Sequence, residues 1–493
     1  MKKLLYILAP AVLAAGCNKF IDVQPRSFSN AATFYTTESG IAEGVNGAYN
    51  GLQTIYGTGS SFWAMAEERS DNTTFEYNNS DRGALQREQL DYFMATVDNS
   101  YLQGTWGNFY TAISQCNAVL DNAAGVDMTD SSRNLYVGQT EFIRALLYFD
   151  LVRLFGGVPL VLHAVVSPED AFAKNGRASA DSVYMQIIAD ATDAAGKLPA
   201  SWPSAEAGRA TSGAANTLLG EVYLTRKKYS DAVTAFGKVT GYSLMTDYQD
   251  LFDPAHKNNV ESVFEVQYTS TVQGEASSFI YTYAPLYSGF KTIASFSASS
   301  GGGRNIPTRD LMNAFEKNDR RKAASISWFV DPLNEAYDEA QHDSMPYIRK
   351  FAATPPLPNE QDVDFPVYRY AEVLLWKAEA LNELGETAQA LPLINEVRNR
   401  AGLGNLAALS QTAFREAVYH EERVESAFED QRWFQLLRTG QAASVMTHHG
   451  TAQKAYQKWL PAEAYDLQPY KLLLPIPLRE VTLNKLEQNP GWQ

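Results

Sequence analysis

The stretch GAANTLLGEVYLTRKKYSDAVTAFGKVT, at 213–240, decides the fold that we expect for this chain. Its first half places Gly220 on one expected helix, and its second half places Ala232 and Phe236 on another at helical spacing. Small residues suit the positions where two paired helices approach closely, and an aromatic ring fills the gap beside them. The stretch therefore predicts two helices packed tightly against each other.

The same spacing is typical of the tetratricopeptide repeat, in which Leu-Gly-x-x-Tyr on one helix is followed by Ala-x-x-x-Phe on the next. A second copy lies at 371–400, AEVLLWKAEALNELGETAQALPLINEVRNR. There Ala378 and Ala390 keep the interval between the two small residues, and Ile394 replaces the phenylalanine. Because such repeats need about three or more units to bury a continuous core, we expect further degenerate copies, for instance around 107–124.

Two other patterns complete the expected architecture. The stretch 139–157 carries apolar residues on most sides of a helix, and its Asp150 and Arg153 lie one turn apart, where a buried pair is expected. The stretch 262–269 alternates as a strand does, with either set of alternate residues facing inward. We therefore predict a mainly α protein: a tetratricopeptide-like helical-repeat scaffold with long irregular loops and a few short strands.

The N-terminus has the composition of an export signal. Lys2 and Lys3 precede an apolar run at 4–15, which is shorter than the roughly 20 residues that span a membrane. The sequence Leu-Ala-Ala-Gly-Cys at 13–17 resembles a bacterial lipobox, in which the cysteine is acylated and becomes the first residue of the mature chain. We expect lipid attachment at Cys17 and anchoring to a membrane. The alternative is a plain signal peptide that ends in a cysteine by chance.

Charge and motifs exclude several classes of protein. The formal net charge of −15, with no basic run longer than three residues, argues against nucleic-acid binding, because neutralising phosphates requires clustered Lys and Arg. No Gly-x-Ser-x-Gly, P-loop or His-Glu-x-x-His motif occurs, and only six histidines are present. The dense charges at 421–432 are interpreted as structural pairing along an amphipathic helix. We therefore expect no catalytic residue, metal ion or cofactor.

Several separate stretches together resemble the SusD/RagB family, the surface lipoproteins of nutrient-uptake systems in Bacteroidetes. They span nearly the whole mature chain in the order of the family. They are CNKFIDVQP at 17–25, EFIRALLYFDLVRLFGGVPLV at 141–161, DLMNAFEKNDRR at 310–321, YRYAEVLLWKAEALNELG at 368–385, EVRNRAGL at 396–403, EERVESAFEDQRWFQLLRTG at 421–440 and LLLPIPLREVTLNKLEQNPGW at 472–492.

Three residues depart from the pattern of the family. Asp430 stands where the family usually has glycine, Gln435 where aspartate is common, and Ser426 where a larger apolar or acidic residue is frequent. These departures put the local ion-pair network in doubt, although they do not affect the resemblance as a whole.

The resemblance implies a non-catalytic binding protein of the cell outer membrane, lipid-anchored and surface-exposed. Such a protein sits as a lid over a SusC-like, TonB-dependent barrel, captures a glycan or another nutrient, and delivers it for uptake. Resemblance and patterns together divide the chain into a lipoprotein signal peptide at 1–16, a lipidated tether at 17–36, an N-terminal helical half with a tetratricopeptide-like repeat at 37–265, a loop-rich aromatic insertion at 266–360, and tetratricopeptide-like helices with the terminal signature of the family at 361–493.

Sugars present apolar CH faces flanked by hydroxyls, so a sugar site combines aromatic rings with amide, carboxylate and guanidinium groups. Two regions offer that mixture. In 60–82 the candidates for ligand contact are Trp63, Arg69, Asp71, Asn72 and Tyr77, beside Phe75, Asn78 and Asn79. In the insertion they are Tyr281, Tyr283, Tyr287, Phe290 and Trp328. The alternative is that most of these rings are packed, or touch the barrel.

Three hypotheses for the function stay open at this point. The first is the surface binding lipoprotein just described. The second is a surface-anchored glycoside hydrolase, because the chain is rich in acidic and aromatic residues. The third is an assembly scaffold that binds a partner helix in the groove of its repeats and has no small ligand.

Overall fold

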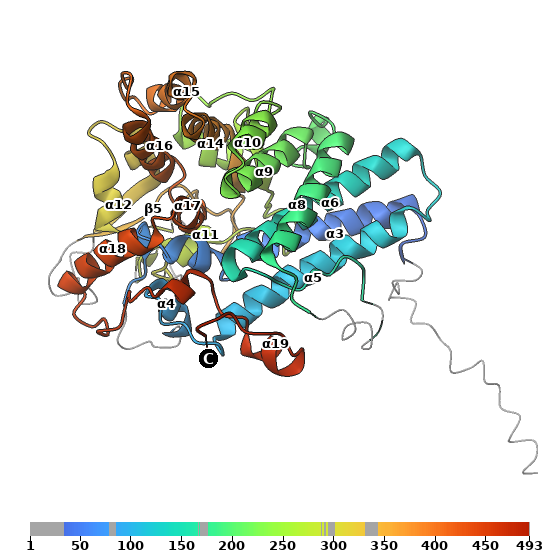
Figure 1. Cartoon of the computed structure of the whole chain (residues 1–493), viewed down its shortest axis with the longest axis horizontal. Coiled ribbons are helices and arrows are strands. Elements are labelled where there is room, and N and C mark those ends of the chain that lie inside the picture. Colours follow the sequence, from blue (N-terminus) through green and yellow to red (C-terminus); the bar gives the residue numbers. More distant parts are fainter. Residues whose placement is uncertain are drawn as a thin grey trace, which may run out of the picture.

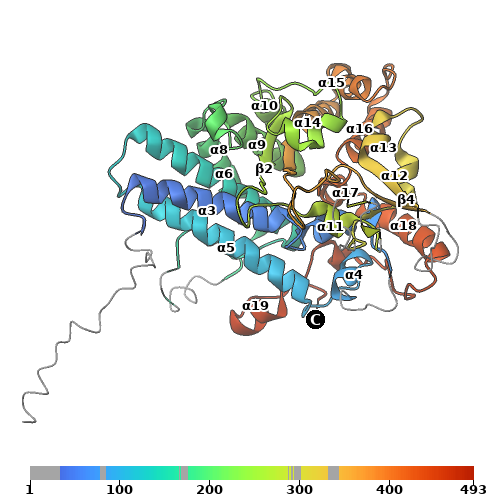
Figure 2. The same ribbon diagram turned by 180° about the vertical axis from the view of Figure 1, so that it is seen from behind.

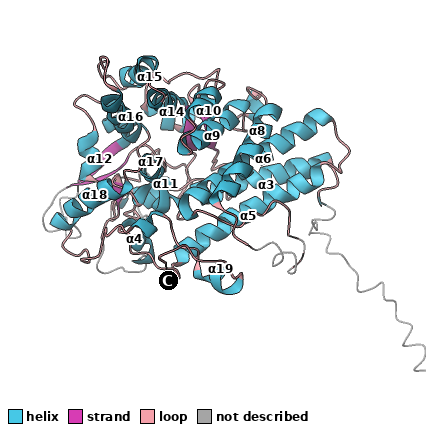
Figure 3. Ribbon diagram, in the orientation of Figure 1, coloured by secondary structure: helices cyan, strands magenta, loops and turns pink. Residues whose placement is uncertain are grey.

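The computed structural model of this chain describes residues 34–77, 85–165, 167, 176–286, 288–289, 292–293, 301–330 and 344–492. Helices make up most of this part, with a few short strands among them (Figure 3). The prediction of a mainly α fold is confirmed. The expected signal peptide and most of the expected tether lie outside the described residues, so both stay predictions.

The longer helices form one array, in which each packs against the next along the chain (Figures 1 and 2). Because α10 packs against α14, the array continues across the insertion that separates them in sequence. The expected degenerate copy at 107–124 lies almost entirely in α5. The members of the array are α3 (Glu38–Tyr56), α5 (Ser100–Ala123), α6 (Asp130–Phe155), α8 (Ala180–Lys197), α9 (Ser212–Thr225), α10 (Tyr229–Phe236), α14 (Tyr370–Glu383), α15 (Thr387–Arg400) and α16 (Gln411–Glu425).

The predicted helix pair at 213–240 is confirmed as α9 and α10. A Cβ atom added to Gly220 would lie 2.3 Å from the ring of Phe236, so the glycine is what lets the aromatic ring of α10 reach α9. Both Phe236 and Ala232 are buried. The small residue and the aromatic ring therefore act as the pattern predicts, with the ring filling the gap between the helices.

The predicted second copy is confirmed as α14 and α15. Ala378, Ala390 and Ile394 are fully buried in one cluster, which Phe414 of α16 completes. Gly385 adopts a φ of +82°, which a glycine reaches without strain, and it lies in the turn between the two helices.

The helix expected at 139–157 is present as α6, but it begins nine residues earlier. The side chain of Thr129 accepts a hydrogen bond from the backbone N–H of Ser132 at 3.0 Å and caps the helix. The added first turns are polar and partly exposed, so the apolar pattern did not reveal them. The expected pair forms within α6: Arg153 contacts Asp150 at 2.5 Å and also reaches Glu221 of α9 at 2.5 Å.

The remaining elements are short except for α18, and most of them lie at the lower left in Figure 1, below α14, α15 and α16. The helices are the π-helix η1 (Ala64–Glu68), α4 (Leu85–Asp91), α11 (Phe279–Tyr283), α12 (Arg309–Ala314), α13 (Arg320–Ser325), α17 (Arg432–Thr439), α18 (Ala442–Tyr456) and α19 (Leu478–Leu483). The strands form antiparallel pairs: β1 (Thr73–Thr74) with β3 (Ile306–Pro307), β2 (Ser262–Val266) with β6 (Phe365–Arg369), and β4 (Ile326–Val330) with β5 (Ser344–Ile348).

The β2–β6 pair ties the two halves of the array together. β2 contacts α3 and α9, and β6 runs directly into α14. The strand predicted at 262–269 is thus confirmed over its first five residues, and Val263 to Val266 are all buried, because both faces of this strand are covered. Among the helices of the described residues, none has the length and apolarity needed to cross a membrane.

Replacing Gly220 by alanine should destabilise the fold, because the added methyl group would collide with the ring of Phe236. Overpacking of this kind costs about 1–3 kcal/mol, measurable as a lower free energy of unfolding in urea for the mature fragment without its lipid. The matched control is Gly47→Ala on α3, where a Cβ atom meets nothing within 4 Å. There alanine should stabilise the helix by up to about 1 kcal/mol. Equal effects at the two sites would contradict the close-packing role of Gly220.

Candidate functional site

The two regions that the sequence analysis singled out lie side by side. β1, which follows η1, pairs with β3, which lies in the insertion. The backbone N–H of Asn305 donates to the Glu68 carboxylate at 2.8 Å, and the Thr308 hydroxyl donates to the Asp71 carbonyl at 2.7 Å. Residues 60–77 and the insertion therefore form one site, although more than 200 residues separate them in sequence.

Glycines in the insertion allow it to lie directly against the end of α11. A Cβ atom on Gly301 would sit 2.2 Å from the carbonyl oxygen of Ala284. The backbone N–H groups of Gly302 and Gly303 donate to the carbonyls of Tyr281 and Ala284 at 2.8 and 2.9 Å. We call this contact of Gly301–Gly303 with α11 the glycine seam. It fixes the backbone on which Tyr281 is carried.

Three of the candidate side chains are in the core. Trp63 is 1% exposed, and its ring meets the buried ring of Tyr283 edge-on at 5.7 Å. The guanidinium of Arg69 lies over the rings of Phe93 and Trp433, at 4.3 and 5.1 Å, and burial lowers the pKa of Arg69 to about 9. In this arrangement these residues hold the site in place, and their contact with a ligand stays a prediction that burial disfavours.

Asp71 and Asn72 are also buried, and they connect the site to the C-terminal part of the chain. Arg432 donates to both carboxylate oxygens of Asp71 at 2.8 and 2.9 Å. Arg423 reaches Asp71 at 2.8 Å and Asn72 at 2.9 Å. Burial alone would raise the pKa of Asp71, but the two guanidiniums outweigh it and hold that pKa well below its ordinary value. For these two residues as well, ligand contact stays a prediction.

Tyr77 is half-buried and stacks on a residue that the sequence analysis did not select. Its ring and the ring of Trp459 lie 4.0 Å apart and are inclined by only 12°. Trp459 is half-buried too, and it contacts Phe75 at 5.5 Å between ring centres. No motif surrounds Trp459, so the only available signal was its residue type.

Partly exposed groups extend this aromatic pair. Tyr281 is half-buried, and its hydroxyl has no hydrogen-bond partner among the described residues. Arg87 lies 5.3 Å from the Trp63 ring, and Arg304 follows the glycine seam. Trp328, on the neighbouring hairpin β4–β5, is 50% exposed. We call the group formed by Tyr77, Arg87, Tyr281, Arg304 and Trp459 the candidate aromatic surface.

Some candidates lie outside the described residues, and their roles stay predictions. These are Cys17, Asn78, Asn79, Tyr287 and Phe290.

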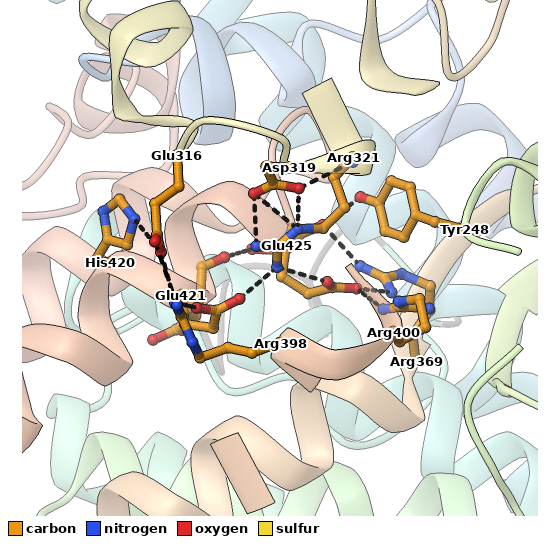
Figure 4. Close-up of polar contacts among 12 residues, drawn as sticks. Tyr248, Glu316, Asp319, Arg321, Arg369, Arg398, Arg400, His420, Glu421 and Glu425 are labelled. Atoms are coloured by element: carbon orange, nitrogen blue, oxygen red, sulfur yellow. Dashed lines mark hydrogen bonds and ion pairs between the residues drawn. The ribbon is translucent and has the colours of Figure 1, made fainter. Parts of the chain in front are cut away.

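Several charged side chains form a buried network of ion pairs and hydrogen bonds (Figure 4). At its centre, the carboxylate of Glu425, on α16, forms ion pairs with three guanidinium groups. The N–O distances are 2.7 Å to Arg369, 3.1 Å to Arg321 and 2.5 Å to Arg400. Burial by itself would raise the pKa of Glu425, but the guanidiniums of Arg400, Arg369 and Arg321 hold it well below its ordinary value. The carboxylate therefore stays ionised at neutral pH.

The network extends to four more carboxylates. Glu421 contacts Arg321 at 2.6 Å and Arg398 at 2.9 Å, and Glu261 contacts Arg369 and Arg400 at 2.9 Å each. Asp319 pairs with Arg321, and Glu429 pairs with Arg369 and Lys350. The interpretation of 421–432 as structural pairing agrees with these contacts. The expectation that pairs run along one helix is wrong, because these partners come from other segments.

Gln435, one of the departures from the family pattern, preserves its part of the network. Its amide oxygen accepts from Arg432, and its amide nitrogen donates to Glu422 at 2.7 Å. An ionised aspartate could accept from the arginine but could not donate to the glutamate. Ser426 donates to the carbonyl of Glu422 at 2.8 Å.

Asp430, the departure at a glycine position, is under strain. Its φ of +60° lies in the left-handed region that glycine adopts most easily. It is 3% exposed, and neither carboxylate oxygen has a hydrogen-bond partner among the described residues. Burial, and then the carboxylates of Glu67, Asp150 and Glu429, raises the pKa of Asp430 well above its ordinary value. This side chain is therefore protonated over a wide range of pH.

The described residues contain no group of three or more His, Cys, Asp or Glu side chains placed to hold a metal ion. One carboxyl of the candidate site has the raised pKa of a general acid: burial raises the pKa of Glu67 to about 7. It is fully buried and accepts hydrogen bonds from Asn72 at 2.9 Å and from the backbone of Phe428 at 3.0 Å. A substrate at the surface has no access to it in this arrangement.

Two family models match the chain. The model described as the SusD family matches residues 326–492, and the model described as starch-binding associating with outer membrane matches residues 19–224. The two matched ranges include both the β1 side of the candidate site and its C-terminal partners.

Similar proteins match almost the entire chain. A SusD-like protein of Formosa agariphila is 26% identical, and the match covers 95% of this chain and 94% of that protein. A solved laminarin-binding SusD-like protein is 27% identical, with a TM-score of 0.78, and covers 93% of this chain and 100% of its own. Surface glycan-binding protein A from Bacteroides thetaiotaomicron, solved in complex with laminarihexaose, is 22% identical at a TM-score of 0.74, covering 92% of this chain and 100% of its own, and shares the fold.

Replacing Asp430 by asparagine should stabilise the protein increasingly as the pH rises. In the unfolded chain this carboxyl ionises near its ordinary value of 3.8, whereas the folded protein keeps it protonated to higher pH. Stability that is present below that value is therefore lost as the pH rises toward the folded pKa. Over this window the advantage of Asp430→Asn should grow by about 1.4 kcal/mol per pH unit, measured by urea unfolding between pH 4 and pH 8.

The matched control is Asp231→Asn, which changes an exposed aspartate on α10. Its difference in unfolding free energy from the parent protein should hardly change with pH. A pH-independent difference for Asp430→Asn would mean that Asp430 is ionised in the folded protein, contrary to our assignment.

Proposed function

Because the chain belongs to the SusD family, we propose that it is a lipid-anchored glycan-binding protein of the outer-membrane surface. It holds an oligosaccharide without cleaving it and passes it to a SusC-like, TonB-dependent barrel, over which it acts as a lid. The protein as a whole is a binding module in this proposal, and it does not act as an enzyme.

One observation carries the glycan part of the proposal: the partly exposed rings of the candidate aromatic surface, assembled from three distant segments beside two guanidinium groups. Tyr77 and Trp459, stacked on each other, are both half-buried, and the part of an aromatic ring that stays exposed suits the CH face of a sugar. Arg87 and Arg304 supply hydrogen-bond donors for hydroxyl groups. The similar laminarin-binding protein supports glycan as the class of ligand.

Hydrolysis is the less well supported alternative. A glycosidase places two carboxyl groups on either side of the bond that it cleaves, within reach of the substrate. At this site the carboxylates of Glu67, Glu68, Asp71 and Asp91 are all buried, and each one accepts a hydrogen bond from the protein. Their raised or lowered pKa values are explained by burial and by their ion pairs.

The outer-membrane part of the proposal rests on the N-terminal sequence and on the matched family model. Acylation of Cys17 would hold the protein at the membrane surface, because several acyl chains anchor firmly whereas one anchors only marginally. The barrel partner comes to this chain from its family.

Replacing Trp459 by alanine should weaken glycan binding by about tenfold or more, equal to about 1.4 kcal/mol. The mature fragment without its lipid would be titrated calorimetrically with a panel of neutral hexasaccharides, including laminarihexaose and maltohexaose. The matched control is Trp492→Ala, the same change at a half-buried ring that packs on Tyr470 in another part of the molecule. The control should bind as the parent protein does.

The same samples would be assayed for new reducing ends. Release of reducing ends that disappears in Glu67→Gln, or in a variant of another single carboxylate, would establish a hydrolase and overturn the binding proposal. Equal binding by Trp459→Ala and by the parent protein would remove the candidate aromatic surface as the glycan site.

Replacing Cys17 by serine should move the protein from the membrane fraction to the soluble fraction, because the acyl attachment site is lost. The parent protein, extracted from membranes, should bring a large β-barrel with it, and the variant should not. Mass spectrometry of the mature N-terminus provides the direct check. An unacylated start in the parent protein would contradict the proposed anchor.

A further inference from the structure

A cavity of about 330 Å³ lies beside α3, and its lining includes none of the residues of the candidate aromatic surface. α3 forms one wall with Asn46, Asn50 and Gln53, and the loop Ala205–Arg209 forms the other. β2 supplies the base. The volume falls at the lower end of the range of small-molecule sites, about 300–1,000 Å³.

A second cavity, of about 200 Å³, continues the first along the C-terminal half of α3. The two share Asn50 and Gln53, and the second extends to Thr58 and Ser278. From Asn46 to the end of α3 at Tyr56, the helix advances about 15 Å. We call the joined cavities the α3 groove, an open trough that is longer than a single sugar ring.

The α3 groove has an apolar base and a polar rim. Phe264, Val266 and Leu52 line the base, and all three side chains are buried. Tyr49 lies beside them. Its hydroxyl donates a hydrogen bond to the side chain of Gln139 at 3.1 Å, and the guanidinium of Arg209 lies 5.9 Å from the centre of its ring. An apolar base with a few placed polar groups is the arrangement of a small-molecule site.

The charged groups of the groove already have partners. Glu206 pairs with Arg209, and Glu265 accepts from the backbone of Asn258 at 2.5 Å and from Ser262 at 2.9 Å. Glu275 accepts from Asn50 at 3.5 Å. Among the described residues that line the groove, the carboxylates outnumber the single guanidinium, so an anionic ligand does not fit, whereas an uncharged one needs no counter-charge.

Two amide groups on the rim retain unused hydrogen-bonding capacity. Asn46 accepts from Arg209 through its oxygen at 3.1 Å, and its amide nitrogen has no partner among the described residues. Asn50 donates to Gln53 at 2.7 Å, and its amide oxygen has no partner in the same set. They lie four residues apart on α3, so they project on the same side of the helix. Together they offer one donor and one acceptor above the apolar base.

We propose that the α3 groove is a second saccharide site, which binds a neutral oligosaccharide independently of the candidate aromatic surface. The half-buried ring of Tyr49 contacts the CH face of a sugar ring, and Asn46 and Asn50 contact hydroxyl groups. A chain with two separate sites can hold a long glycan at two points, which raises its effective affinity beyond that of either site.

The test is hydrogen exchange of the mature fragment with millimolar laminarihexaose, maltohexaose and xylohexaose, and with an anionic hexasaccharide of mannuronic acid. The reporters are the backbone amides of 204–209 and 270–276, in loops that border the groove. At least one neutral hexasaccharide should slow exchange there by about threefold or more, and the anionic one should not. Failure of all three neutral probes, or protection by the anionic one, overturns the proposal.

Two variants assign the protection to the groove. The double variant Asn46→Leu with Asn50→Leu should lose it, whereas Asn122→Leu, the same change at an exposed position on α5, should keep it. Protection that survives the double variant contradicts the proposal. Protection in the groove should also survive Trp459→Ala. If it does, the α3 groove stands even where glycan binding at the candidate aromatic surface fails, and if it is lost, the groove is not an independent site.

Discussion

The carboxylate of Glu425 is the constraint on which the rest of the structure depends. A buried charge is tolerated only when it is paired, and removing one partner from a buried network costs about 3–5 kcal/mol. Glu425 receives its three arginines from α13, the end of β6 and α15, segments that are far apart in sequence. A shift of any one of these segments would break at least one of these buried ion pairs. The network therefore fixes the register between the helical array and the irregular part that carries the candidate site.

The sequence was sufficient to predict the helical scaffold, because helical repeats are stabilised by contacts between residues that are near one another in the chain. Gly220 and Phe236 are only 16 residues apart, so their spacing in the sequence was enough to predict that they lie in contact. The charges at 421–432 were recognised as structural because many charges close together on an amphipathic helix must pair. Their partners could not be predicted, because Arg321 and Arg369 approach Glu425 from other elements and no local pattern encodes this.

For the candidate site, the sequence identified the regions but could not separate exposed residues from buried ones. Asp71 has the residue type of a sugar ligand, yet its partner Arg432 lies 361 residues away and takes both of its oxygens. Trp459 stands outside any motif and was missed, although it stacks on the selected Tyr77. Whether a polar or aromatic side chain faces solvent is decided by tertiary packing, which only the structure supplies.

The glycine seam has a consequence for how such proteins diversify. At Gly301 any side chain would collide with the backbone of Ala284 and Pro285, just after α11, so selection can hardly vary this inner edge of the insertion. Tyr281, which the seam holds in place, is only half-buried. A lineage can therefore replace such a surface ring, and change what the surface recognises, while the glycines beneath it are inherited unchanged.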